Sequence, residues 1–168
     1  MTAPFHIRLE TAADRTAVDA LIERAFGPGR YAKAAERLRE GNSARADLSL
    51  TGWMGGVLAG AVRLWPIRIG DAPALLLGPI VVAPEHRGHG LSAALTQDAC
   101  RRATEAGDGL VLLVGEARLF EPLGFQQVEA GRVRLPGPVD PRRVFVRALR
   151  PDAFDGVGGD VDAALPAP

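Results

Sequence analysis

Residues 80–92 read IVVAPEHRGHGLS, and the prediction of the fold starts from them. A short apolar strand leads into a glycine-containing turn, and the turn opens a helix. Such a turn directs backbone N–H groups and the positive end of the helix dipole at one anion. Gly88 and Gly90 have no Cβ and allow unusual backbone angles, and Arg87 adds positive charge. The stretch therefore predicts an anion-binding loop.

The segments on either side of this loop predict two parallel strands. Residues 74–82 (ALLLGPIVV) are nearly all apolar, which indicates a central strand buried on both faces. A helix is expected from about Leu91 to Ala106, followed by a strand over Leu110–Val114. Strand, loop, helix and strand in this order predict a parallel pair joined by a right-handed crossover.

The rest of the chain supplies further elements. Residues 47–54 and 57–69 read as an antiparallel hairpin. From Thr11 to about Ala25, apolar residues recur at three- and four-residue steps, which is typical of an amphipathic helix. The other expected elements are strands at 5–9, 125–134 and 143–149 and short helices at 31–40 and 117–123.

The composition fits one ordinary domain. The chain has 168 residues, of which 47% are hydrophobic and 24% charged, and this excludes wholesale disorder. No apolar run approaches the ~20 residues of a membrane span, and the first residues lack the pattern of a signal peptide. The single cysteine, Cys100, forms no internal disulfide. We expect a cytoplasmic protein with no membrane partner.

Charge is distributed unevenly along the chain. Residues 151–168 contain four acidic residues and no basic one, and they are rich in glycine, proline and alanine. We expect them to form a disordered acidic tail after a domain at residues 1–150. The arginines of that domain are scattered and aromatic residues are only 5% of the chain, so no nucleic-acid partner is expected.

Two further motifs carry a family resemblance. Val82, Pro84, Arg87, Gly88 and Gly90 match the pattern V-x-P-x-x-R-G-x-G in register. Residues 119–125 (LFEPLGF) resemble a later L-Y-x-x-x-G-F element, and residues 113–116 read LVGE. With the order of strands and helices, the chain resembles the GNAT superfamily of acyl-CoA-dependent N-acetyltransferases, in a bacterial branch whose strand–helix junction reads LVG followed by Asp or Glu.

The resemblance implies a fold and a cofactor. The fold is α/β, with a mixed, mainly antiparallel sheet of six or seven strands, a parallel central pair that opens to admit the cofactor, and about four flanking helices. Acetyl-CoA is the implied co-substrate, with no metal, and an amine of a small molecule or peptide is the implied acceptor. The implied cofactor-binding residues are Ile80, Val81, Val82, Arg87, Gly88, His89, Gly90, Leu91 and Ser92.

The resemblance also suggests where a general acid and a general base of the reaction would lie. Glu116, at the end of the strand 110–114, is the candidate base, and a carboxylate that complements a helix N-terminus is the alternative for it. Phe120 stands where the family usually has a tyrosine that acts as general acid, and Ser92 replaces a usual glycine or alanine. Tyr31, the only tyrosine, is a second hypothesis for the acid, on its location alone.

The sequence is also compatible with other functions. Phe120 favours a domain that binds acyl-CoA as a sensor or interaction module without efficient catalysis. Residues 88–93 (GHGLSA) also fit the dinucleotide pattern G-x-G-x-x-A, which keeps an oxidoreductase as a third reading. His86 and His89 have no third ligand near them in sequence, so no metal site is expected. The identity of the acceptor is open, and so is a homodimer.

Overall fold

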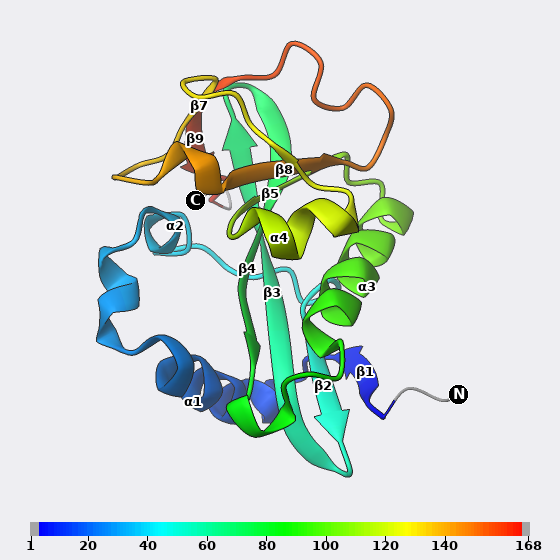
Figure 1. Ribbon diagram of the computed structural model, residues 1–168. Coiled ribbons are helices and arrows are strands. Elements are labelled where there is room, and N and C mark those ends of the chain that lie inside the picture. Colours follow the sequence, from blue (N-terminus) through cyan, green and yellow to red (C-terminus); the bar gives the residue numbers. More distant parts are fainter. Residues whose placement is uncertain (1–3, 166–168) are drawn as a thin grey trace.

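A computed structural model describes residues 4–165 of the chain (Figure 1). Its helices are α1 Arg15–Phe26, α2 Ala34–Arg37, α3 Leu91–Glu105 and α4 Ala117–Phe120. Its strands are β1 His6–Leu9, β2 Leu50–Met54, β3 Val57–Ile69, β4 Ala72–Val82, β5 Leu110–Val114, β6 Gln126–Gln127, β7 Val133–Arg134, β8 Val144–Ala148 and β9 Gly159–Ala163. Within these residues, no helix is long and apolar enough to cross a membrane.

The strands form one mixed sheet. Its main order is β1-β2-β3-β4-β5-β8-β6, and β9 pairs with the far part of β3 and with β7. The central β4–β5 pair and the small β7–β9 pair are parallel, and the other pairs are antiparallel. The predicted α/β fold with a parallel central pair is confirmed. A doubly wound parallel sheet, which the dinucleotide reading needs, is excluded.

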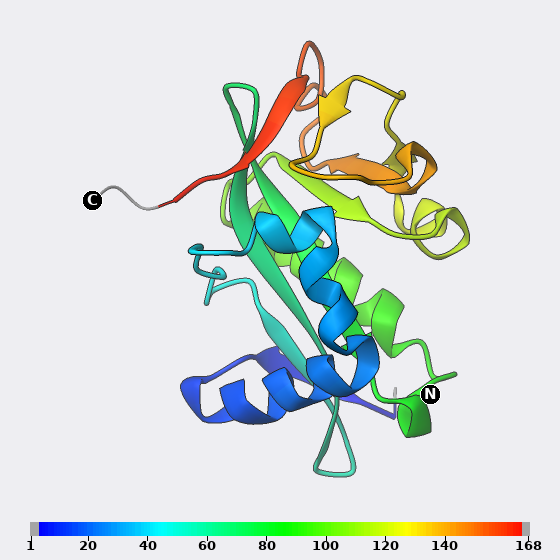
Figure 2. The same cartoon turned by 90° about the vertical axis from the view of Figure 1, so that its left-hand side faces the viewer.

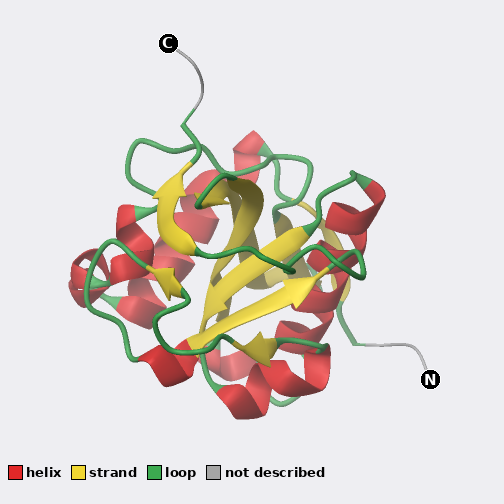
Figure 3. Ribbon diagram, turned by 90° about the horizontal axis from the view of Figure 1, so that it is seen from above, coloured by secondary structure: helices red, strands yellow, loops and turns green. Residues whose placement is uncertain are grey.

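Helices cover both faces of the sheet. Figures 1 and 2 show α1 and α2 on one side of β3 and β4, with α3 on the other, and Figure 3 shows the sheet between them. Alternate residues of β4 and β5 supply both cores: Leu75 and Val111 pack with α3, whereas Leu76 and Leu112 lie in the core of the opposite face. The continuous apolar run of residues 74–82 is therefore that of a strand buried on both faces.

The prediction of a disordered tail is wrong for residues 151–165. Strand β9 pairs with β3 from Ile67 to Ile69 and with β7, and it buries Val161. Phe154, in the turn before β9, is also buried, and the Arg132 guanidinium lies 3.7 Å from the centroid of its ring. Glycine and aspartate dominate the composition, but these few apolar side chains complete the core. Residues 166–168 lie outside the described part.

Two other expectations differ in detail. The expected helix at 31–40 is shorter: a 3-10 turn at Pro28–Ala32 and the single-turn α2 flank Lys33, whose backbone is extended (φ −78°, ψ 144°). The described sheet has nine strands rather than six or seven. The additional strands are short or lie in the supposed tail: β6 and β7 have two residues each, and β9 follows Pro151.

Candidate functional site

The central strand β4 has an open edge. It pairs with β5 only at Leu75–Val111 and Leu76–Leu112, while its pairing with β3 continues to Val82. Among the strands of residues 4–165, β4 therefore has a neighbour on one side only from Leu77 onward. A free strand edge presents N–H and C=O groups to which an extended ligand can add as another strand.

A bulge marks the place where the edge opens. Val62 of β3 pairs with Ile80 and Leu64 pairs with Leu77, so β4 carries one extra residue opposite Arg63. A bulge bends a strand and locally ends its regular pairing. Pro79, in the bulge, has no N–H to offer to a neighbour. The carbonyl of Gly78 accepts a hydrogen bond of 2.6 Å from the Trp65 indole N–H.

The backbone groups of Ile80 and Val82 face the open edge. The Ala83 N–H donates to the Ala59 carbonyl over 2.8 Å, on the side of β3. Because successive strand residues direct their N–H and C=O groups to opposite edges, Val81 shares no group with the open edge, whereas Val82 and Ile80 do. The Arg87 Nε–H donates to the Val82 carbonyl over 3.2 Å, which agrees with this orientation.

The loop after β4 leads directly into α3. A 3-10 turn at Pro84–His86 precedes two glycines with positive φ, Gly88 at 88° and Gly90 at 80°. A Cβ at either position meets no atom within 4 Å, so the conformation rather than crowding requires glycine. The first α3 bond of this end runs from the Ala94 N–H to the Gly90 carbonyl. The N–H groups of residues 91–93 are therefore available to an anion.

Small residues in the sheet place the start of α3. The buried Leu91 side chain lies over Gly52 of β2 and Gly60 of β3. A Cβ on Gly52 would lie only 2.6 Å from Leu91 Cδ1. Leu91 thus serves as a packing residue that positions the helix terminus, while Arg87, Gly88, His89, Gly90 and Ser92 are accessible around it.

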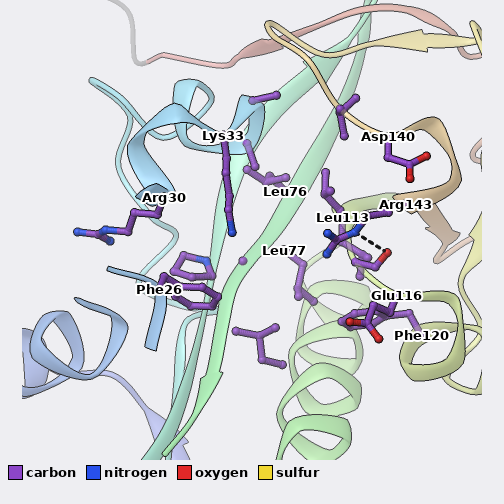
Figure 4. Close-up of a pocket in the computed structure, with 18 of the residues that line it drawn as sticks. Phe26, Arg30, Lys33, Leu76, Leu77, Leu113, Glu116, Phe120, Asp140 and Arg143 are labelled. Atoms are coloured by element: carbon purple, nitrogen blue, oxygen red, sulfur yellow. Dashed lines mark hydrogen bonds between the residues drawn. The ribbon is translucent and has the colours of Figure 1, made fainter. Parts of the chain in front are cut away.

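A pocket of about 480 Å³ lies where β4 and β5 separate. Its walls come from β4, β5, α4, the segment between α1 and α2, and the loop before β8 (Figure 4). Of the residues predicted for the site, Ile80, Ser92 and Glu116 line it. Val81 does not line it, because its side chain is buried against α1. Apolar residues make up much of the wall, among them Phe26, Leu76, Leu77, Leu113 and Phe120.

Glu116 lies at the rim of this pocket. It is the N-cap residue of α4, its carboxylate makes no capping hydrogen bond, and its side chain is 52% exposed. One carboxylate oxygen lies 2.9 Å from Arg118 Nε. A single-turn helix has only a weak dipole, so the capping role gains little support for Glu116. Its position at the pocket rim is the stronger indication of its role.

Phe120 closes the pocket wall next to Glu116. Its side chain is buried and meets Phe125 edge-on, with ring centroids 5.9 Å apart. Its ring covers the backbone of Gly115, where an added Cβ would clash with Phe120 Cε2. The ring carries no proton to donate. The side chain of Tyr31, the other candidate acid, lies outside the described part of the structure.

The remaining reactive side chains lie away from the pocket. Cys100 is fully buried in α3, and burial raises the pKa of its thiol to about 11, so it is protonated at neutral pH. His86 and His89 lie in the loop before α3. Among the side chains that the structure describes, no group of three or more His, Cys, Asp or Glu could hold a metal ion.

The charged residues in the other walls of the pocket were not predicted from the sequence. Lys33, Arg39, Asp140 and Arg143 line the pocket but belong to segments without a recognisable motif. One signal was present, since Lys33 is the only lysine in a chain with 20 basic residues.

Comparisons with known proteins show the family and the fold of the chain. Residues 15–125 match the model of the acetyltransferase (GNAT) family. The uncharacterized N-acetyltransferase YhbS of Escherichia coli K12 is 29% identical over 158 residues, which are 93% of this chain and 94% of that protein.

Solved structures show the same fold. The crystal structure of Escherichia coli YhbS in complex with CoA has a TM-score of 0.81 and 27% identity, and covers 97% of this chain and 91% of that chain. A GNAT acetyltransferase of Brucella melitensis in complex with acetyl-CoA shares the fold, with a TM-score of 0.61, 24% identity, and coverage of 92% and 100%. Because the family model spans well over half of the sequence, the chain belongs to the acetyltransferase (GNAT) family.

Proposed function

We propose that this protein transfers an acetyl group from acetyl-CoA to a primary amine. One observation carries the proposal: the open edge of β4 at Ile80 and Val82 runs directly into the glycine loop and the free N–H groups of α3. An extended arm with a diphosphate at its far end fits a strand edge followed by an anion-binding helix terminus. The CoA complex of Escherichia coli YhbS supports the same ligand here.

In this proposal, the loop and the strand bind the co-substrate mainly through their own backbone groups. Arg87, Gly88, His89, Gly90, Leu91 and Ser92 bind the diphosphate through N–H groups and the charge of Arg87. Glu85 does not oppose this anion with a free charge, because its carboxylate lies 3.0 Å from Arg24 Nη2. Ile80 and Val82 pair with the pantetheine arm, and Val81 fixes the strand by packing against α1. This mode of binding makes few demands on side chains.

The transfer is direct attack within a ternary complex. The amine nitrogen forms a bond to the acetyl carbon, the carbon–sulfur bond breaks, and the sulfur leaves with the electron pair. Backbone N–H groups near Val82 at the open edge polarise the carbonyl and stabilise the negative charge that develops on its oxygen. The apolar wall of the pocket, which includes Leu77 and Phe120, limits water around the reacting atoms.

Glu116 is the proposed base. It accepts a proton from the attacking amine, directly or through a water molecule, from its place on the pocket rim. No acid is assigned to Phe120. A thiolate is a stable leaving group, and a water molecule can return the proton. General acid help is typically worth about 10²- to 10⁴-fold in rate, so transfer without it is slower but not abolished.

A second candidate function rests on Phe120. A domain that binds acyl-CoA without turning it over needs the loop and the strand edge but no acid, and the buried phenylalanine fits that role. The two functions differ in one observable, the consumption of acetyl-CoA when an amine is added.

The test is a transfer assay with a panel of primary amines, read by release of the CoA thiol and by mass spectrometry of the acetylated product. We expect turnover with at least one amine and a loss of about 10²-fold or more in kcat for Glu116→Gln, with acetyl-CoA binding retained. Arg118→Gln, which removes only the ion-pair partner of Glu116, is the control variant. Binding of acetyl-CoA with no turnover of any amine overturns the enzyme assignment in favour of the binding module.

A further inference from the structure

Six charged residues line the pocket between β4 and β5, and their charges do not cancel. The four cations are Arg30, Lys33, Arg39 and Arg143, and the two acids are Glu116 and Asp140. Each acid has its own cation outside the wall: Glu116 lies 2.9 Å from Arg118, and Asp140 lies 2.9 Å from Arg142. Each carboxylate is therefore shared with a cation outside the wall, and the wall carries more positive than negative charge.

Two of the four cations also have a carboxylate of their own. Arg39 lies 2.9 Å from Glu36, in a pair with little exposure, and Arg30 lies 3.1 Å from Glu23. These pairs join residues of the segment between α1 and β2 to each other or to α1. They belong to the packing of that wall, and a ligand would have to compete with them.

Lys33 and Arg143 have no carboxylate within ion-pair distance among the residues that the structure describes. The Lys33 ammonium lies 5.4 Å from the centroid of the Phe26 ring, and Arg143 Nε lies 3.5 Å from the Gly115 carbonyl oxygen. Figure 4 shows the two side chains extending from opposite walls toward the same space. Two positive charges without an ion-pair partner among the described residues thus converge on one pocket with largely apolar walls.

These cations belong to other elements than the loop that takes the diphosphate. Arg143 lies at the carboxyl end of β5, where its carbonyl accepts a hydrogen bond of 2.8 Å from the Gly115 N–H, and Lys33 belongs to the segment between α1 and α2. The diphosphate has its own donors in Arg87 and the N–H groups of residues 91–93, so an anion between Lys33 and Arg143 is assigned to the other substrate.

We propose that Lys33 and Arg143 bind a negatively charged group of the acceptor, so that the acceptor is a small amine that also carries a carboxylate or a phosphate. The inference rests on the proposed function, because it concerns the second substrate of the same site. The planar guanidinium of Arg143 suits two oxygens of one oxyanion, and Lys33 adds a point charge from the opposite wall. A neutral or polycationic amine leaves both charges uncompensated, and the polycation is repelled by them.

Matched amine pairs test the proposal. β-Alanine is compared with β-alaninamide, and O-phosphoethanolamine with ethanolamine, at saturating acetyl-CoA. We expect the charged member of at least one pair to have a kcat/KM at least about tenfold higher, as one charge-assisted hydrogen bond provides. Which pair shows the larger ratio tells a carboxylate subsite from a phosphate subsite.

Variants assign the effect to the two residues. Lys33→Gln and Arg143→Gln are each expected to raise the KM of the charged amine about tenfold or more and to leave the KM of acetyl-CoA and the rate with the neutral amine unchanged. Lys33→Arg, which keeps the charge, restores most of the affinity. Arg134→Gln is the matched control, since Arg134 pairs with Asp160 away from the pocket. Equal rates for charged and neutral amines, or equal losses for both in the variants, overturn the proposal.

Failure of the transfer reaction is a separate outcome. If acetyl-CoA binds but no amine is acetylated, the same compounds are titrated calorimetrically into the CoA-loaded protein. Binding of β-alanine or O-phosphoethanolamine that is lost in Lys33→Gln and Arg143→Gln supports the anion subsite while the proposed enzyme fails. Absence of binding by both charged compounds overturns the subsite.

Discussion

Phe120 lies in the pocket wall, and its role can be predicted only in part from the sequence. The sequence places a phenylalanine where the resembling family usually has tyrosine, and the structure gives that residue a buried ring in the pocket wall. What could not be predicted is its partner. The ring lies over Gly115, so the glycine of the LVGE junction is required by a contact that only the folded chain makes.

Asp14 gives a pH-dependent prediction at the same scale. Its buried carboxylate accepts hydrogen bonds from the Arg8 guanidinium and from the backbone N–H of Thr11, at 2.7 and 2.8 Å. These bonds, the one from Arg8 above all, lower the pKa of Asp14. We expect Asp14→Asn to lower the free energy of unfolding by about 1–2 kcal/mol at pH 7, because a helix-start cap and a charged hydrogen bond are weakened.

The effect must diminish in acid. A carboxyl whose pKa is lower in the folded state stabilises the fold above its unfolded pKa of about 4, and this contribution is lost as pH falls toward the folded value. Urea denaturation at pH 7 and at about pH 3 should therefore show a smaller difference between the two proteins at the lower pH. Asp152→Asn, at an exposed position, is the control. A difference that stays constant or grows in acid contradicts this account of Asp14.

At the scale of elements, the sequence predicts strands better than it predicts where their pairing stops. The apolar run 74–82 and the strand–helix–strand order correctly indicate a central parallel pair. The end of that pairing after Leu76 depends on the bulge opposite Arg63, which is a property of two strands in register. The sequence pattern of either strand alone does not predict where this pairing ends.

For the segment that forms strand β9, the amino-acid composition predicts disorder, and this is wrong. A segment rich in glycine and aspartate reads as disordered, yet Phe154 and Val161 join the core. We expect Phe154→Ala to lower the free energy of unfolding by about 3–5 kcal/mol, the usual cost of removing a buried aromatic side chain. Chemical denaturation measures it, with the exposed Asp155→Ala as control. Equal stabilities of Phe154→Ala and the wild type would mean that this segment does not pack as described.

At the scale of the whole molecule, the walls of the pocket come from distant parts of the chain. Motifs identify the glycine loop and Glu116, because each is a local pattern attached to a strand end. Lys33 and Arg143 are 110 residues apart and carry no motif, and only the packing of the segment after α1 and the loop before β8 against the same opening brings them together. The part of the site proposed to bind the cofactor can thus be predicted from sequence motifs. The part proposed to bind the acceptor cannot, because only the tertiary structure brings its residues together.

If the glycine loop and the open edge of β4 bind acetyl-CoA, a calorimetric titration measures that binding. Acetyl-CoA, CoA and NADH are titrated into the wild type and into an Arg87→Ala, Gly90→Glu double variant. The control variant, Arg134→Ala with Gly131→Glu, makes the same changes at another open glycine with φ of 86°. We predict binding of acetyl-CoA and CoA in about the micromolar range, retained in the control and lost in the loop variant. Binding of NADH without CoA, or CoA binding unchanged by the loop variant, would contradict the account.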